Sequence, residues 1–189
     1  MPITTLDEKT ALVVIDMQKG ILAMPTIQPA AGVLANVVQL VDAFREKQRP
    51  VVLVHVGWGP DRADALASRN QSGRSVPNPP PDFFEYAGEL RADGSRDILI
   101  HKRQWGAFYG TDLDLQLRRR RITNIVLCGI STSIGVESTA RDAWERAYNL
   151  TFVSDAMTDS DADAHDRALR IIFPRIGEIG TTRDVLANL

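Results

Sequence analysis

Three groups of residues that could do chemistry each follow a predicted strand of this 189-residue chain. Asp16 ends one apolar, β-branched run, and Lys102 lies just past another. The third group is a turn rich in Gly, Ser and Thr, residues 129–135, which follows the apolar residues 125–127. Because α/β proteins bind ligands where the carboxyl ends of parallel strands meet, we expect the three groups to form one site.

An aspartate and a lysine that lie together are suited to acid/base chemistry. The ammonium can hold the carboxylate ionised as a base, or it can stabilise negative charge that develops on a substrate. Taken alone, each residue also fits a structural role, Asp16 as the N-cap of a turn and Lys102 as a surface charge. The coincidence of both with strand ends favours the chemical interpretation.

The turn offers binding groups of a different kind. Ser131 and Thr132 supply N-cap oxygens, and helical spacing of Val, Ala and Trp continues to about residue 147. A helix N-terminus presents free N–H groups, and small residues let a ligand approach the backbone closely. We therefore expect the backbone of residues 132–135 to cradle a ligand.

The elements that position these groups alternate along the chain. Continuous apolar runs predict buried strands at residues 10–16, 51–56, 97–100, 125–127, 150–154 and 176–179. Apolar stripes predict helices at residues 31–47, after 111, at 131–147, at 162–173 and after 181. This alternation predicts a three-layer, Rossmann-like α/β fold with a parallel sheet flanked by helices, formed by one domain over residues 1–189.

Local patterns mark two helix starts and one long loop. Thr111 with Asp114, and Thr181 with Asp184, have the spacing of a capping box. Residues 57–81 are rich in Gly, Pro, Ser, Asn and Arg without a sustained period, which favours a functional loop. Trp58 at its start has two interpretations, the wall of a pocket or a plug at the edge of the core.

Composition and charge restrict the partners. A formal net charge of -2 argues against a nucleic-acid binder, and the basic run at residues 118–121 is expected to be a solvated helix end. The N-terminus shows no basic start followed by an apolar core, and no apolar run is long enough to span a membrane. We expect a cytoplasmic protein that binds a small-molecule substrate.

Metal and cofactor sites are not predicted. The single cysteine, Cys128, allows neither an internal disulfide nor a site built from several cysteines, and it fits a reducing compartment. His55, His101 and His165 lie on separate segments, without the spacing of a metal site, and we expect His165 on an exposed helix face. A nucleotide-binding Rossmann protein is disfavoured, because no G-x-G-x-x-G turn follows the first strand.

Three ordered motifs resemble the isochorismatase-like hydrolase superfamily. They are ALVVIDMQ at residues 11–18, KRQWGAFYGTDLDLQLRRR at 102–120 and GISTSIGVESTARDA at 129–143, so the likeness spans nearly the whole chain. The resemblance implies six parallel strands in the order 3-2-1-4-5-6. It also implies a homo-oligomer, a dimer or tetramer.

The resemblance also implies which positions are catalytic. Amidase members of the superfamily use an Asp, a Lys and a Cys nucleophile, and these positions correspond here to Asp16, Lys102 and Gly135. Glycine has no side chain that could attack a carbonyl, which disfavours a thioester mechanism. Cys128 lies seven residues earlier, inside a strand, where we expect it to be buried and inert.

Isochorismatases likewise carry Gly at this turn. They cleave a vinyl ether, which the Asp protonates, and water then attacks the cation. This chain departs from them in having Ser131 where they have Tyr, and it looks like an uncharacterised bacterial subgroup.

The sequence thus predicts a metal-independent hydrolase of a small metabolite. Asp16 would be the acid/base and Lys102 its electrostatic partner; the predicted pocket lining is Gln18, Trp58, Trp105, Phe108, Ser131 and Thr132, with core packing as the other interpretation of the aromatic residues. A serine mechanism is disfavoured because no His is placed to activate the hydroxyls. The alternative function is an inactive relative that binds a ligand or a protein partner.

Overall fold

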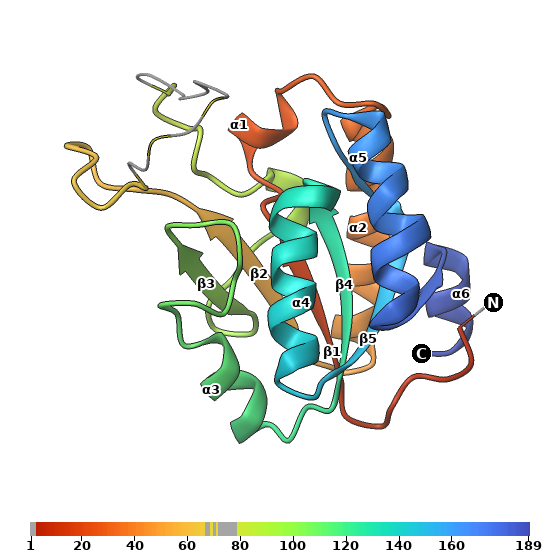
Figure 1. Cartoon of the computed structure of the whole chain (residues 1–189). Helices are drawn as coiled ribbons and strands as arrows, with labels where there is room; N and C mark the ends of the chain where they lie inside the picture. Colours follow the sequence, from red (N-terminus) through yellow and green to blue (C-terminus); the bar gives the residue numbers. More distant parts are fainter. Residues whose placement is uncertain (1–2, 67–68, 70, 72–78) are drawn as a thin grey trace.

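The computed structural model describes residues 3–66, 69, 71 and 79–189. Six parallel strands form one sheet in the order β3-β2-β1-β4-β5-β6, as predicted (Figure 1). The strands are β1 (Thr10–Ile15), β2 (Val51–Val56), β3 (Ile98–Lys102), β4 (Asn124–Ile130), β5 (Asn149–Thr158) and β6 (Glu178–Gly180).

Helices cover both faces of the sheet (Figure 1). The α-helices are α1 (Lys19–Leu22), α2 (Ala30–Glu46), α3 (Leu113–Arg119), α4 (Glu137–Glu145), α5 (Ala162–Arg167) and α6 (Thr182–Ala187). Shorter 3₁₀ turns are η1 (Gly88–Leu90) and η4 (Phe173–Arg175), and π-helical turns are η2 (Thr132–Val136) and η3 (Ala168–Ile172). The α2 and α6 helices pack on one face, and α3, α4 and η3 pack on the other.

The central strands are apolar on both faces because both faces are covered. Every residue of β1 and of β4 is buried. Leu12 pairs with Val51 of β2 and with Val126 of β4. Because successive side chains of a strand point to opposite faces of the sheet, the apolar residues of β1 enter the two cores alternately. Continuous burial explains why these strands are unbroken apolar runs in the sequence.

The ends of several strands differ from the predicted ones. The third strand reaches Lys102, and the last strand begins two residues later than predicted. The fifth strand continues four residues past Ser154, because the register shifts opposite Cys128 and the polar side chains find partners. Ser154 donates to the Gly180 carbonyl at 3.0 Å, and Asp155 accepts from the Thr182 amide at 2.7 Å.

One predicted capping box forms and the other does not. At the start of α6, Thr181 and Asp184 cap each other's backbone amides. At α3 the prediction is wrong: Asp112 is the N-cap residue, and the Asp114 carboxylate accepts from the Tyr148 hydroxyl at 2.9 Å instead. The Thr111 hydroxyl accepts a hydrogen bond from the Leu113 amide at 3.2 Å, one residue earlier than the Asp114 amide that a capping box would use.

Much of the predicted loop at residues 57–81 lies outside the described residues, so that prediction stays open. Within the described ranges, no helix is long and apolar enough to cross a membrane.

Candidate active site

Asp16 and Lys102 form a buried ion pair at the carboxyl edge of the sheet. Lys102 Nζ lies 2.8 Å from Asp16 Oδ2, and their side chains are 1% and 9% exposed. Because β2 separates β1 from β3, the two backbones are about 10 Å apart. The long lysine side chain spans that gap, and Asp16 leaves the strand with a positive φ of 51°. Lys102 also donates to the Trp105 carbonyl at 2.6 Å.

The two carboxylate oxygens of Asp16 have different surroundings. Oδ2 faces Lys102, whereas Oδ1 is buried and has no hydrogen-bond partner among the described residues. Burial raises the pKa of Asp16 to about 6, and the nearby Lys102 charge offsets only part of that effect. Oδ1 is therefore the oxygen on which a proton is not opposed by the lysine ammonium.

Gly135 lies beside this pair, on η2. A Cβ built at Gly135 would stand 3.3 Å from Asp16 Oδ2 and 3.3 Å from Lys102 Nζ. The same atom would lie 2.9 Å from Ile15 Cγ2, closer than real Cβ contacts allow. The three positions implied by the family resemblance therefore meet in space, and Ile15 fills part of the room that a side chain at position 135 would need.

The turn that carries Gly135 is anchored from the end of β5. Ser133 donates both its amide and its hydroxyl to Asp159 Oδ2, at 2.7 and 2.8 Å. The amides of Ile134 and Val136 donate to the Ser131 carbonyl, at 3.2 and 3.1 Å. These amides are already engaged, so they do not face a ligand. Asp159 was not among the predicted site residues, because the fifth strand was predicted to end at Ser154 and the polar residues 154 and 155 hid its continuation to Thr158.

Known proteins resemble this chain over nearly its whole length. The isochorismatase domain model matches residues 10–184. The chain belongs to the isochorismatase family. An uncharacterized isochorismatase family protein, YecD of Escherichia coli O157:H7, is 47% identical over 181 residues, covering 95% of this chain and 96% of the relative.

A solved relative and a named enzyme extend the comparison. The structure of an isochorismatase family protein from Burkholderia thailandensis superposes with a TM-score of 0.94 at 47% identity, covering 99% of this chain and 98% of the other. Ureidoacrylate amidohydrolase RutB of Rhizobium rhizogenes is 32% identical over 178 residues, covering 82% of this chain and 72% of the enzyme. The chain is thus an isochorismatase-family hydrolase.

In this family member, the hydroxyl of Thr132 is engaged inside the protein. It donates to the Thr158 carbonyl at 3.1 Å, so the 2.8 Å contact with His165 Nδ1 places the proton on the histidine nitrogen. His165 is only 4% exposed, and the prediction of an exposed position was wrong, because the Thr132 hydroxyl gives its ring a buried partner. Ser131 is partly exposed at the start of the turn.

The other predicted pocket residues lie in different surroundings. Gln18 is fully buried and pairs its amide group with the backbone of Val56, at 2.8 and 2.9 Å, which holds the end of β2. Phe108 packs in the core beside Tyr148, so its ring has the structural role. Trp58 is partly buried against Phe84, with the ring centroids 5.1 Å apart.

Trp105 contributes its backbone to the site, while its indole is 61% exposed. Cys128 is buried in the α2-side core, and burial raises the pKa of its thiol. No cluster of His, Cys, Asp and Glu suited to a metal ion is found within the described part of the chain.

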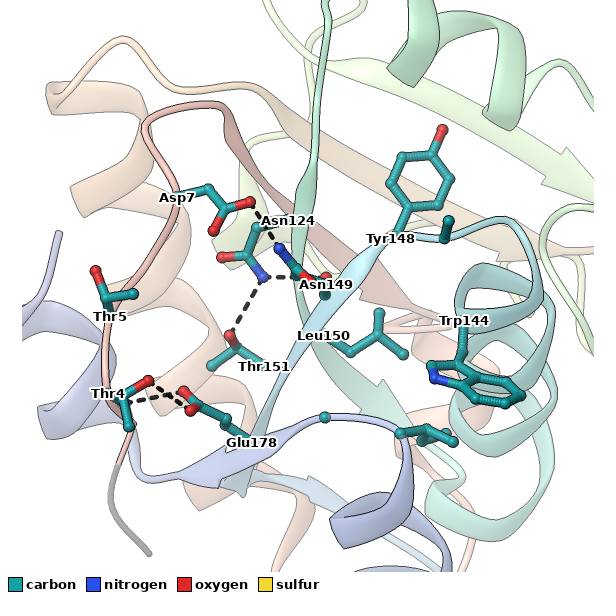
Figure 2. Close-up of a pocket in the computed structure, with 13 residues that line it drawn as sticks. Thr4, Thr5, Asp7, Asn124, Trp144, Tyr148, Asn149, Leu150, Thr151 and Glu178 are labelled. Carbon is teal, nitrogen blue, oxygen red and sulfur yellow. Dashed lines mark hydrogen bonds between the residues drawn. The ribbon is translucent and has the colours of Figure 1, made fainter.

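A hollow of about 640 Å³ lies at the opposite, amino-terminal edge of the sheet (Figure 2). Trp144 lies on one side, and Asp7 and Glu178 are the carboxylates that line it. Both carboxylates are engaged: Asp7 accepts from Asn149 at 3.0 Å, and Glu178 accepts from the backbone and hydroxyl of Thr4. Because the hollow lies at the opposite edge of the sheet, it is distinct from the Asp16 site.

Proposed function

We propose that this family member is a metal-independent hydrolase that uses no covalent nucleophile. Asp16 is the general acid, Lys102 its electrostatic partner, and the substrate is a small metabolite with a vinyl-ether bond or a related C–O or C–N bond. One observation supports the proposal: Gly135, which the family resemblance places at the nucleophile position, lies beside Asp16 and Lys102 with Ile15 packed against it.

The surroundings of Asp16 suit a general acid. With a pKa of about 6, about one tenth of Asp16 is protonated at pH 7, far more than for a solvent-exposed aspartate. The proton would reside on Oδ1, because Oδ2 faces the lysine ammonium. After transfer, Lys102 stabilises the carboxylate that remains.

The reaction balances without an enzyme-bound intermediate. Asp16 gives its proton to the substrate carbon of the vinyl ether, and the ether oxygen stabilises the cation that forms. Water adds to that cation and returns a proton to Asp16. The hemiketal then collapses to a ketone and an alcohol, so both electrons of the broken C–O bond leave with the alcohol oxygen.

Gly135 also supports placement in a subgroup that lacks the nucleophilic cysteine. A thiol at this position would require Ile15 to move, because the Cβ alone already approaches Ile15 Cγ2 to 2.9 Å. The packing of β1 is therefore matched to glycine, which is a structural reason to place this chain with the nucleophile-free members.

The test is pyruvate release from isochorismate by the purified protein, with ureidoacrylate offered in parallel because RutB hydrolyses that compound by name. Asp16→Asn should lower turnover of an accepted substrate at least a hundredfold, since general acid catalysis contributes on the order of 10²–10⁴. The control is Asp82→Asn, whose exposed carboxylate lies 3.7 Å from Lys19, outside the site. Turnover that survives in Asp16→Asn would contradict the proposal.

An inactive family member that binds a ligand or partner is the second candidate. The absence of a side chain at Gly135 and the burial of the ion pair favour it. Saturable binding of a substrate analogue without turnover, unchanged in Asp16→Asn, would select this candidate.

A further inference from the structure

A second hollow lies at the amino ends of β2 and β3, at the opposite ends of the strands from the Asp16 site. Its volume is about 370 Å³, within the range of small-ligand sites. Val51 and Ile98, the first residues of the two strands, line its floor. Asp16 directly follows β1 and Lys102 is the last residue of β3, so both lie at the opposite edge of the same sheet.

The lining of this hollow is strongly basic. Four arginines from three segments line it: Arg45 and Arg49 at the end of α2 and in the loop after it, Arg96 before β3, and Arg120 after α3. Asp97 is the single carboxylate of the lining. The hollow therefore carries a formal charge of about +3, in a chain whose net charge is -2.

The one carboxylate of the lining is already neutralised. Asp97 accepts from Arg45 Nε at 3.1 Å and from Nη2 at 2.7 Å, a two-pronged ion pair. Arg96 Nε approaches the same carboxylate only to 3.8 Å. Within the lining, Asp97 therefore offsets the charge of one arginine, and Arg96 also lies 4.0 Å from Asp93 Oδ2 outside the lining.

Two of the arginines reach acceptors outside the lining. Arg49 donates to the Asp7 carbonyl and to the backbone oxygen of Leu189, both at 3.3 Å. Arg120 donates to the Gln116 carbonyl at 3.0 Å. The positive charge of these two arginines is thus not balanced by any group that lines the hollow.

One guanidinium nitrogen is buried without a hydrogen bond. Arg45 Nη1 has no partner in the described part of the chain, and its nearest ion-pair contact is Asp42 Oδ1 at 3.8 Å. The Arg45 side chain as a whole is 13% exposed. Asp97 therefore satisfies the hydrogen-bonding capacity of the Arg45 guanidinium only in part.

We propose that this hollow binds a small, multiply charged oxyanion, of the class of phosphate-bearing metabolites. Arginine forks match the oxygens of a phosphoryl group in pairs, and several forks around one hollow favour two or more negative charges. The site includes Arg120 from the basic run at residues 118–121, which the proposed hydrolysis leaves without a role. It is independent of the Asp16 chemistry.

The test measures pyrophosphate binding to the full-length protein by isothermal titration calorimetry. The variant is Arg96→Gln with Arg120→Gln, because both side chains are exposed and their loss should leave the fold intact. The matched control is Arg119→Gln with Arg170→Gln, two exposed arginines that do not line the hollow and whose removal changes the net charge equally. Inorganic phosphate serves as the smaller probe.

We expect saturable binding that the hollow variant weakens at least tenfold, a loss of about 1.4 kcal/mol. The control pair should change the Kd by no more than about threefold, since neither side chain lines the hollow and exposed charges are screened by salt. Amide NMR shifts should locate the bound probe at residues 45–51 and 94–98. Absence of saturable binding at about 10 mM pyrophosphate, or equal weakening by the control pair, would overturn the site, because charge-assisted contacts from several arginines should give tighter binding.

Discussion

At the scale of single residues, the ionisation of Asp16 governs the proposed chemistry. Its pKa is raised to about 6 by burial, although Lys102 Nζ lies only 2.8 Å away. Desolvation of the carboxylate therefore outweighs the attraction of the ammonium. The result is a carboxyl group that changes protonation near neutral pH while it lies beside the ammonium group of Lys102.

The raised pKa predicts a pH dependence of stability. Between about pH 4 and pH 6 the folded state binds more protons at Asp16 than the unfolded state, whose pKa is near 3.8. The free energy of unfolding should therefore fall as pH rises through this window, by about 3 kcal/mol at most. Urea unfolding of the wild type and of Asp16→Asn from pH 4 to 7 should show this slope in the wild type alone. Parallel curves would contradict it.

A second prediction concerns the space at Gly135. Gly135→Ala should destabilise the protein by about 1–3 kcal/mol, because the new Cβ would meet Ile15 Cγ2 at 2.9 Å. The control is Gly32→Ala in α2, where a Cβ meets nothing within 4 Å and should stabilise the helix by about 0.5–1 kcal/mol. Chemical denaturation measures both. Equal effects of the two variants would show that Ile15 yields easily.

At the scale of elements, the η2 turn depends on the end of β5. Asp159 is buried and accepts from the amide and hydroxyl of Ser133 and from the Ser160 amide. One carboxylate thus joins two segments that lie 26 residues apart in the chain. The position of Gly135 relative to Asp16 follows from this link as much as from β4.

Asp159→Ala should loosen the turn without unfolding the sheet. It removes the acceptor for two amides, each of which costs about 1–3 kcal/mol when left unsatisfied. Hydrogen exchange at Ser133 and Ser160 should therefore accelerate, while exchange in β1 stays slow. Ser133→Ala is the control, since it keeps the backbone bond and removes only the hydroxyl. Unchanged exchange in Asp159→Ala would show that other contacts hold the turn.

At the scale of the whole molecule, the sheet order grades local stability. The central strands β1 and β4 are buried throughout and hydrogen-bonded on both sides, whereas β3 and β6 form the edges. Hydrogen exchange measured by mass spectrometry should therefore be slowest in β1 and β4 and fastest in β6, which has three residues. Protection of β6 equal to that of β4 would contradict this, unless a further copy of the chain covers that edge.

The fold class and the location of the candidate site could both be predicted from the amino-acid sequence. Unbroken apolar runs such as β1 and β4 are local features, and parallel strands place their carboxyl ends at one edge. Asp16, Lys102 and the turn at residues 129–135 could therefore be grouped from their places at strand ends, the family resemblance singled out Gly135 within that turn, and folding brings the three together. The order of the strands followed from the family resemblance.

Which side chains share an environment became known from the folded chain. The contact of Thr132 with His165 joins residues 33 apart, and that of Arg45 with Asp97 joins residues 52 apart. A local pattern contains no information on such partners, because burial and charge pairing depend on neighbours brought close by folding. For the same reason the basic hollow, whose arginines come from three separate segments, could be recognised only once the chain was folded.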